Sequence, residues 1–238
     1  MGITRKALAL TCGLFFSHGW AHAASLDKGL EAYQAGDFKT ALAQWLLFAE
    51  QGNASAQSNV ALMYEQGKGV VQNHQAAVHW YTLAAEQGEA IAQANLGAMY
   101  DTGRGVAEND NTAIEWLNLA ARQGYAHAQA YLGVMYVNGE GVTTDYLRAY
   151  MWWSLAADNG DQPSAQYQHS IASKMSPAHV TKAQKMAIRC FNSDYNDCWP
   201  LTFAHTQVQP CLDPNHPAHK RTVPECFHEL VAMFFVVL

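Results

Sequence analysis

The chain has 238 residues, half of them apolar, which is enough to build a packed core and argues against wholesale disorder. Its formal net charge is −6, and −8 without the first 23 residues, so a positive footprint for nucleic acid is absent and no nucleic-acid partner is expected. The length alone is compatible with one or two ordinary domains.

The first segment, residues 1–23, has the pattern of a secretory signal peptide. Arg5 and Lys6 precede a short apolar run, and small residues follow in an A-x-A arrangement that ends at Ala23. We expect cleavage between Ala23 and Ala24, and a mature protein that is periplasmic or secreted. A membrane anchor is the alternative, but the apolar run is about half of the roughly 20 residues that span a bilayer.

Residues 24–53, with Tyr33, the Gly36-Asp37 turn and Trp45, are predicted to form one helix pair, which resembles the tetratricopeptide type. Apolar residues recur at helical spacing on both sides of the Gly36-Asp37 turn, with Tyr33 before it and Trp45 after it. This pair would lead into the repeat array that follows.

Residues 54–161 consist of three copies of one 36-residue unit. The blocks 54–89, 90–125 and 126–161 align without a gap, and 14 positions hold the same residue in all three. In the first block these are Ala54, Ala56, Gln57, Met63, Tyr64, Gly67, Gly69, Val70, Ala77, Trp80, Leu83, Ala84, Ala85 and Gly88. Such a period indicates stacked units, because a single unit cannot bury both of its apolar faces.

Each block is predicted to fold as two antiparallel helices. In the second block, apolar and small residues follow Ala92 at i+4 and i+7, and Gly103 supplies the left-handed cap that ends the first helix. Asp110 or Asn111 would cap the second helix, which ends at Gly124. The Gly-x-Gly between the helices is interpreted as a turn.

The pattern A-x-A-Q-x-x-L-G-x-M-Y-x-x-G-x-G-V, followed by A-x-x-W-x-x-x-A-A-x-x-G, resembles the Sel1-like repeat, a relative of the tetratricopeptide repeat. Block 54–89 departs from it only at Val60 and Ala61 within the first helix. The resemblance implies an all-α fold, a right-handed α-solenoid of stacked antiparallel helix pairs whose first helices line a concave surface.

Residues 162–198 are predicted to be C-terminal capping helices. One begins near Ser164, and Pro177 opens the next at the position where proline is favoured. The remaining segment, residues 199–238, holds five of the seven prolines and shows no repeat register. Its apolar end has nine residues, too few to cross a membrane, so no stable membrane span is expected.

Four cysteines lie in the last fifth of the chain: Cys190, Cys198, Cys211 and Cys226. In an oxidising compartment they favour disulfides, and we expect nearest-neighbour pairing, the first with the second and the third with the fourth. The alternative is a zinc site drawn from the last two cysteines with His216 and His219, although this spacing departs from the usual paired clusters. We therefore expect disulfides and no metal.

The sequence shows no catalytic constellation. Neither G-x-S-x-G nor H-E-x-x-H occurs, and the S-x-x-K match at Ser25 to Lys28 lacks its partner motifs. We predict a protein that is not an enzyme and needs no cofactor. The alternative is an envelope hydrolase or ligand-binding protein acting on cell-wall-derived or β-lactam-like material. Some cysteine-rich Sel1-like proteins are described in that role, but they carry a cysteine pair in each repeat.

The predicted binding surface is the row of first-helix positions that avoids both apolar stripes. It comprises Ser55, Ser58, Asn59, Leu62, Glu65, Ile91, Ala94, Asn95, Ala98, Asp101, His127, Ala130, Tyr131, Val134 and Val137. The row changes from polar to apolar along the array, so we expect a protein or peptide of the cell envelope to bind chiefly to the third block. Tyr131 would be its aromatic anchor. The alternative is that the C-terminal cap or tail covers the row.

Two sets of aromatic residues are predicted to be structural. Tyr146, Tyr150 and Trp153 form an i, i+4, i+7 stripe expected to pack in the core against Ile171 and the final helix. The tryptophan shared by the three blocks is also assigned to the core: Trp80, Trp116 and Trp152.

Overall fold

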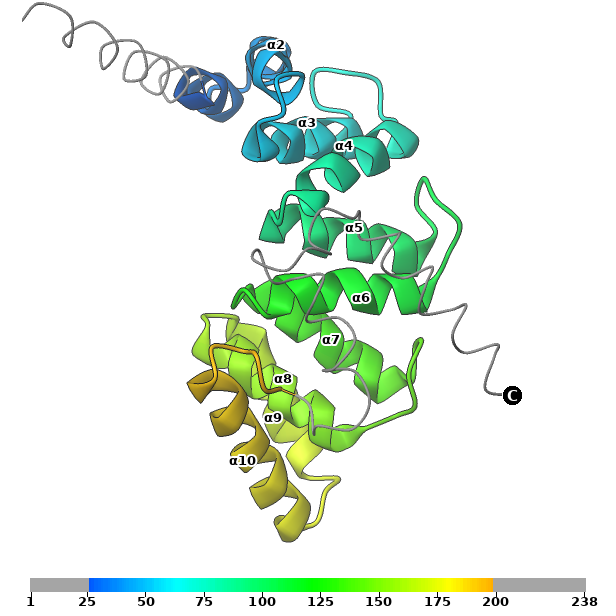
Figure 1. Cartoon of the computed structure of the whole chain (residues 1–238), viewed down its shortest axis with the longest axis vertical. Helices are drawn as coiled ribbons and strands as arrows, with labels where there is room; N and C mark the ends of the chain where they lie inside the picture. Colours follow the sequence, from blue (N-terminus) through cyan, green and yellow to red (C-terminus); the bar gives the residue numbers. More distant parts are fainter. Residues whose placement is uncertain (1–25, 199–238) are drawn as a thin grey trace, which may run out of the picture. The chain divides into compact units, whose positions relative to one another are not determined.

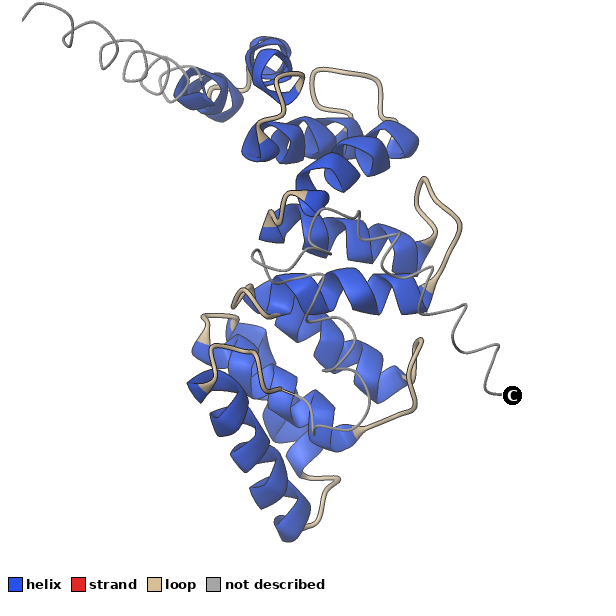
Figure 2. Cartoon of the chain, in the orientation of Figure 1, coloured by secondary structure: helices blue, strands red, loops and turns tan. Residues whose placement is uncertain are grey.

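The computed structural model describes residues 26–198, and its regular secondary structure in that range is entirely helical (Figures 1 and 2). Residues 26–34 are helical and precede nine further helices. These are α2 (Phe38–Ala49), α3 (Ala54–Gln66), α4 (His74–Glu86), α5 (Ala90–Thr102), α6 (Asp110–Ala121), α7 (Ala126–Asn138), α8 (Tyr146–Asp158), α9 (Gln162–Ala172) and α10 (Pro177–Asn192). Among the described residues, no helix is both long and apolar enough to cross a membrane.

The helices form antiparallel pairs that stack in chain order. The pairs α3 with α4, α5 with α6 and α7 with α8 correspond to the three sequence blocks, and α4, α6 and α8 each pack on the first helix of the next pair. The shared alanines Ala56, Ala92 and Ala128 are fully buried, which lets neighbouring backbones approach closely. This arrangement confirms the predicted fold of stacked antiparallel helix pairs.

Asparagine side chains cap three helices of the array, α3, α4 and α6. Asn53 Oδ1 accepts a hydrogen bond from Ala56 N at 2.9 Å, and Asn109 Oδ1 accepts one from Thr112 N at 3.1 Å. The second helix of block 90–125 therefore has Asn109 as its cap, and the prediction of Asp110 or Asn111 is wrong. All three neighbouring side chains can cap a helix, so the sequence alone did not distinguish them.

A ladder of buried amides joins each first helix to its neighbours. The shared glutamine of the second block, Gln93, donates from Nε2 to Ala85 O at 3.1 Å, at the end of the preceding second helix. Its Oε1 accepts from Gln123 Nε2 at 2.8 Å, just beyond the second helix of its own pair. Gln57 and Gln129 make the equivalent bonds. We call this set the amide ladder; it explains why glutamine recurs at this position, since the side chain must both donate and accept.

The second glycine of each Gly-x-Gly does more than form a turn. Gly69, Gly105 and Gly141 all have positive φ, at 73°, 76° and 62°. A Cβ added at any of them would overlap the first residue of the preceding second helix, in α2, α4 or α6. The loop after each first helix is therefore seated against the preceding pair, a contact that the turn interpretation missed.

The predicted aromatic core is confirmed at three of its six positions. Tyr150 and Trp153 are buried, and Trp153 Nε1 donates to Ala130 O at 3.1 Å. Tyr146 is 38% exposed, so its assignment to the core is wrong; it is the first residue of α8, one turn before the buried part of that helix. Trp152 is fully buried, whereas Trp80 and Trp116 are half-buried.

The described chain divides within α10, between Gln184 and Lys185, into two compact units. In the second unit, Cys190 and Cys198 form a disulfide, the first of the two expected pairs. Cys211 and Cys226 lie outside the described residues, as do His216, His219, the predicted signal peptide and segment 199–238.

Peptide mapping under non-reducing conditions should recover both short-range disulfides. Cleavage before Asp194 and Asp197 separates Cys190 from Cys198 unless a disulfide holds the fragments together. Cleavage before Asp213 does the same for Cys211 and Cys226, and a second cleavage after Phe203 separates Cys198 from Cys211. We expect two linked fragment pairs and no free thiol in protein from an oxidising compartment. A cross-pairing, or two free thiols at Cys211 and Cys226, would contradict the predicted connectivity.

Candidate functional site

The predicted row of outward positions on α3, α5 and α7, here called the first-helix face, is accessible at most of its positions. Ile91 is 47% exposed and Val134 is 38% exposed. Among the other predicted contact residues, exposed side chains are Ser55 and His127, and partly exposed ones are Asn59, Asn95, Tyr131 and Val137. Helices within the described residues therefore leave this face accessible to a partner.

Two predicted members of the first-helix face are buried. Ser58 is 6% exposed and Ala94 is 8% exposed, so neither can contact a partner and the prediction is wrong for both. Each follows directly after a glutamine of the amide ladder, on the side of the helix that packs against its neighbours. Their small side chains allowed this burial, which helical periodicity alone did not predict.

A polar cluster lies at the end of α3. Glu65 accepts a hydrogen bond from the Tyr81 hydroxyl at 3.0 Å, and its other oxygen pairs with Arg104 Nη1 at 2.9 Å. Asn95 Nδ2 donates to the Tyr81 hydroxyl at 3.1 Å. Burial, and then the Glu65 carboxylate, raise the pKa of Tyr81 far above its usual range, so this hydroxyl remains a neutral donor.

The second polar cluster links two repeats through Tyr131. Its hydroxyl donates to Asp101 Oδ2 at 2.6 Å, from α7 to α5. Burial raises the pKa of Tyr131, and the Asp101 carboxylate raises it further. Tyr131 is therefore part of the junction between repeats as well as a surface residue, and only its partly exposed ring is available as the predicted anchor.

His127 lies at the start of α7 and is largely exposed. Its Nδ1 is 3.7 Å from Asp161 Oδ1, and Asp161 in turn caps α9 by accepting from Ser164 N at 3.0 Å. The His127 ring also packs edge-to-face on Tyr125, with centroids 5.8 Å apart. The histidine thus contacts Asp161 and Tyr125 at the edge of the first-helix face.

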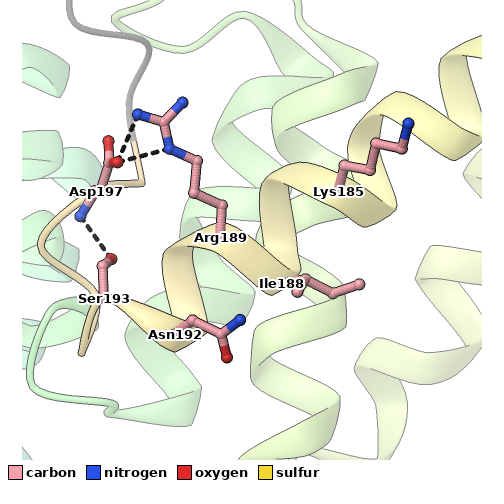
Figure 3. A pocket seen from close by; sticks show the side chains of 6 residues that line it. All are labelled: Lys185, Ile188, Arg189, Asn192, Ser193 and Asp197. Carbon is pink, nitrogen blue, oxygen red and sulfur yellow. Dashed lines mark hydrogen bonds and ion pairs between the residues drawn. The ribbon is translucent and has the colours of Figure 1, made fainter.

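A separate shallow hollow of about 500 Å³ lies at the end of α10 (Figure 3). Its walls include Lys185, Ile188 and Arg189, and Arg189 Nε donates to Asp197 Oδ2 at 2.6 Å. Two of its charged side chains, Arg189 and Asp197, are thus already paired with each other. Residues 26–198 contain no group of three or more histidine, cysteine or acidic side chains placed to hold a metal ion. The first-helix face is the better candidate site.

The polar clusters were absent from the sequence prediction, although a signal for them existed. Glu65 and Asp101 occupy the same repeat position and are both acidic, and Lys68 and Arg104 occupy another and are both basic. Opposite charges at equivalent positions of two blocks indicate a charged contact between repeats, and the structure shows one between Arg104 and Glu65. Individual residues on a helical face do not reveal this; comparison of equivalent positions does.

The chain has three antiparallel helix pairs that follow one another without a gap in the repeat register, and their first helices share an accessible face. These features define a helical repeat protein. The Sel1 repeat model matches residues 54–89, 90–125 and 126–161, the same blocks that the sequence predicted. The chain is a Sel1 repeat protein with three such repeats.

Solved structures agree with this assignment. A Sel1 repeat protein from Oxalobacter formigenes is 32% identical with a TM-score of 0.58, and the alignment covers 60% of this chain and 58% of that one. A protective antigen of uropathogenic Escherichia coli strains displaying an SLR fold is 27% identical with a TM-score of 0.51. That alignment covers 67% of this chain and 42% of the antigen, so the chain spans less than two thirds of either protein. Comparison with curated proteins finds no match.

Proposed function

We propose that this Sel1 repeat protein is a non-enzymatic adaptor of the cell envelope that binds a protein or peptide along its first-helix face. Repeats of this kind typically mediate protein interactions. The observation that carries the proposal is the accessible row in which Ile91 and Val134 expose apolar surface on α5 and α7. Exposed apolar side chains beside fixed polar groups favour association with another chain.

The proposed location rests on the N-terminal sequence pattern. Two basic residues, a short apolar run and an A-x-A site ending at Ala23 are typical of export signals. An exported chain would form its cysteine disulfides in the periplasm or outside the cell, and the Cys190–Cys198 bond is consistent with that environment. The partner would then be found in the same compartment.

Photo-crosslinking from defined positions tests the proposed surface. A crosslinking amino acid at Val134 should give a discrete adduct with one envelope protein, because this side chain is exposed on the α7 part of the face. The matched control is the same amino acid at Glu86, which is exposed at the end of α4 and outside the face. Val134→Asp should weaken binding of the identified partner by about tenfold or more. Equal adducts from both positions, or none from Val134, would contradict the proposal.

A further inference from the structure

At two junctions of the array, a basic residue in the loop after a first helix contacts a side chain that precedes its own repeat. The loop after α3 supplies Lys68, whose Nζ is 2.7 Å from the Tyr33 hydroxyl. The loop after α5 supplies Arg104, whose Nη1 is 2.9 Å from Glu65 Oε1. Lys68 and Arg104 occupy equivalent repeat positions. At these first two junctions, therefore, a cation from one repeat binds an oxygen of the preceding helix.

The third junction reverses the charge of this contact. Glu140 stands where the second junction has Arg104, and Asp101 stands where it has Glu65. The loop position itself is preserved, because Gly141 is seated against the first residue of α6 in the same way as its equivalents at the other junctions. The third junction thus has two carboxylates at the positions where the second has a carboxylate and a guanidinium.

Asp101 also lacks the second donor that Glu65 has. Glu65 accepts from Tyr81, but the equivalent residue of the next second helix is Leu117, which has no hydroxyl. The Tyr131 hydroxyl, at 2.6 Å, is the hydrogen-bond donor that Asp101 has within the described chain. Both carboxylates act on that hydroxyl: burial raises the pKa of Tyr131 most, Asp101 and Glu140 raise it further, and Arg104 opposes them in part.

No lysine, arginine or histidine among residues 26–198 forms an ion pair with Asp101 or Glu140. Glu140 Oε1 accepts only a neutral bond, from Asn138 Nδ2 at 3.0 Å. The three repeats hold eleven acidic and four basic residues, a formal charge of −7. This charge favours the approach of a basic partner, and at the third junction neither carboxylate has a cation paired with it in the described chain.

The surroundings of the junction suit a long basic side chain. Val134 is 38% exposed beside the partly exposed ring of Tyr131, so an aliphatic stem can lie along apolar surface while its charge reaches the carboxylates. The first junction shows how the chain itself holds such a group, with Lys68 Nζ 4.8 Å from the centroid of the Tyr33 ring.

We propose that Asp101, Glu140 and Tyr131 receive a lysine or arginine side chain from the bound partner. The partner segment is an extended peptide in which this basic residue is next to an apolar residue that contacts Val134. The partner's cation would complete at the third junction the contact that Lys68 and Arg104 complete at the first two. This proposal specifies the partner chemistry of the proposed function and rests on it.

A displayed peptide library selected on the full-length chain provides the test. Recovered peptides should be enriched in lysine or arginine next to an apolar residue. One labelled synthetic peptide of that sequence is then titrated by fluorescence anisotropy at about 0.15 M salt, where long-range charge effects are screened beyond about 8 Å. Glu140→Arg recreates the residue of the second junction, so it should weaken peptide binding by about tenfold or more and raise the melting temperature.

The matched control is Glu86→Arg, the same charge change outside the first-helix face. This variant should weaken peptide binding by less than about threefold, because it alters only the screened long-range attraction. An equal loss of peptide affinity with Glu140→Arg and Glu86→Arg would overturn the proposal, since the overall charge of the chain would then explain the effect.

Failure of this proposal can be distinguished from failure of the proposed function. One outcome is that the recovered peptides lack a basic residue, and that their binding is lost with Val134→Asp but unaffected by Glu140→Arg. This outcome would overturn the basic-partner proposal and leave the first-helix face as the binding surface. Peptides unaffected by Val134→Asp would overturn both. Recovery of no peptide would also overturn the basic-partner proposal, while crosslinking from Val134 would still decide the proposed function.

Discussion

Gly105→Ala should destabilise the protein by roughly 2 to 5 kcal/mol, measured by chemical denaturation followed by circular dichroism. The glycine has φ of 76°, a conformation that costs an L-residue about 1 to 2 kcal/mol. The added Cβ would also overlap the backbone of His74, which is part of the helix end and cannot rotate away. Relieving that overlap requires the loop to move off α4, at a further cost of roughly 1 to 3 kcal/mol.

Gly88→Ala is the matched control for this prediction. Gly88 has φ of 88°, so it carries the same conformational strain, but an added Cβ would meet no atom within 4 Å. The difference between the two variants therefore measures the contact between the loop and the preceding pair. Equal free energies of unfolding would mean that the loop is not seated against α4, and the contact would have no structural role.

Trp152→Ala should cost about 3 to 5 kcal/mol, the usual loss for emptying a large aromatic site in a core. The side chain is 1% exposed in the middle of α8, where its neighbours Met151 and Trp153 are also buried. The surrounding helices are held by contacts on both sides, so the cavity should not collapse completely. Thermal and chemical denaturation of the full chain would measure the loss.

The equivalent change Trp116→Ala should be clearly less destabilising. Trp116 occupies the same repeat position, but it is half-buried and packs at the edge of the cluster formed by α3, α4 and α5. Truncation of Trp116 removes less buried apolar surface than truncation of Trp152, and solvent can fill part of the site. If Trp116→Ala cost as much as Trp152→Ala, the difference in burial between equivalent positions would not control stability in this array.

The sequence predicted the helices of the array well because one regularity controls them. Glycine at the end of each first helix and a 36-residue period leave little freedom in where helices begin and end, and the register holds without a gap from Ala54 to Asp161. The register continues into α9. This helix was predicted to begin near Ser164, but it begins at Gln162 because Asp161 caps it. The errors lie where neighbouring residues share the same capping chemistry.

The binding surface was less predictable because periodicity describes one helix at a time. It identified Ile91 and Val134 as outward positions, and both are exposed. It could not show that Ser58 is covered, or that Tyr131 is bound to Asp101 in another repeat. The contact between Tyr131 and Asp101 joins residues 30 positions apart in the chain, and it becomes visible only when whole pairs are stacked.

The amide ladder makes the junctions between repeats interchangeable. Each ladder glutamine needs only a carbonyl from the preceding pair and an amide from its own pair, and neither depends on which side chains face outward. A duplicated copy of residues 90–125 would therefore meet its original through the same bonds. Its arginine, at the position of Arg104, would also face Asp101, the carboxylate that has no cationic partner in the described chain. The array could thus gain whole repeats that form the same amide-ladder bonds at their junctions. Each added repeat would extend the first-helix face.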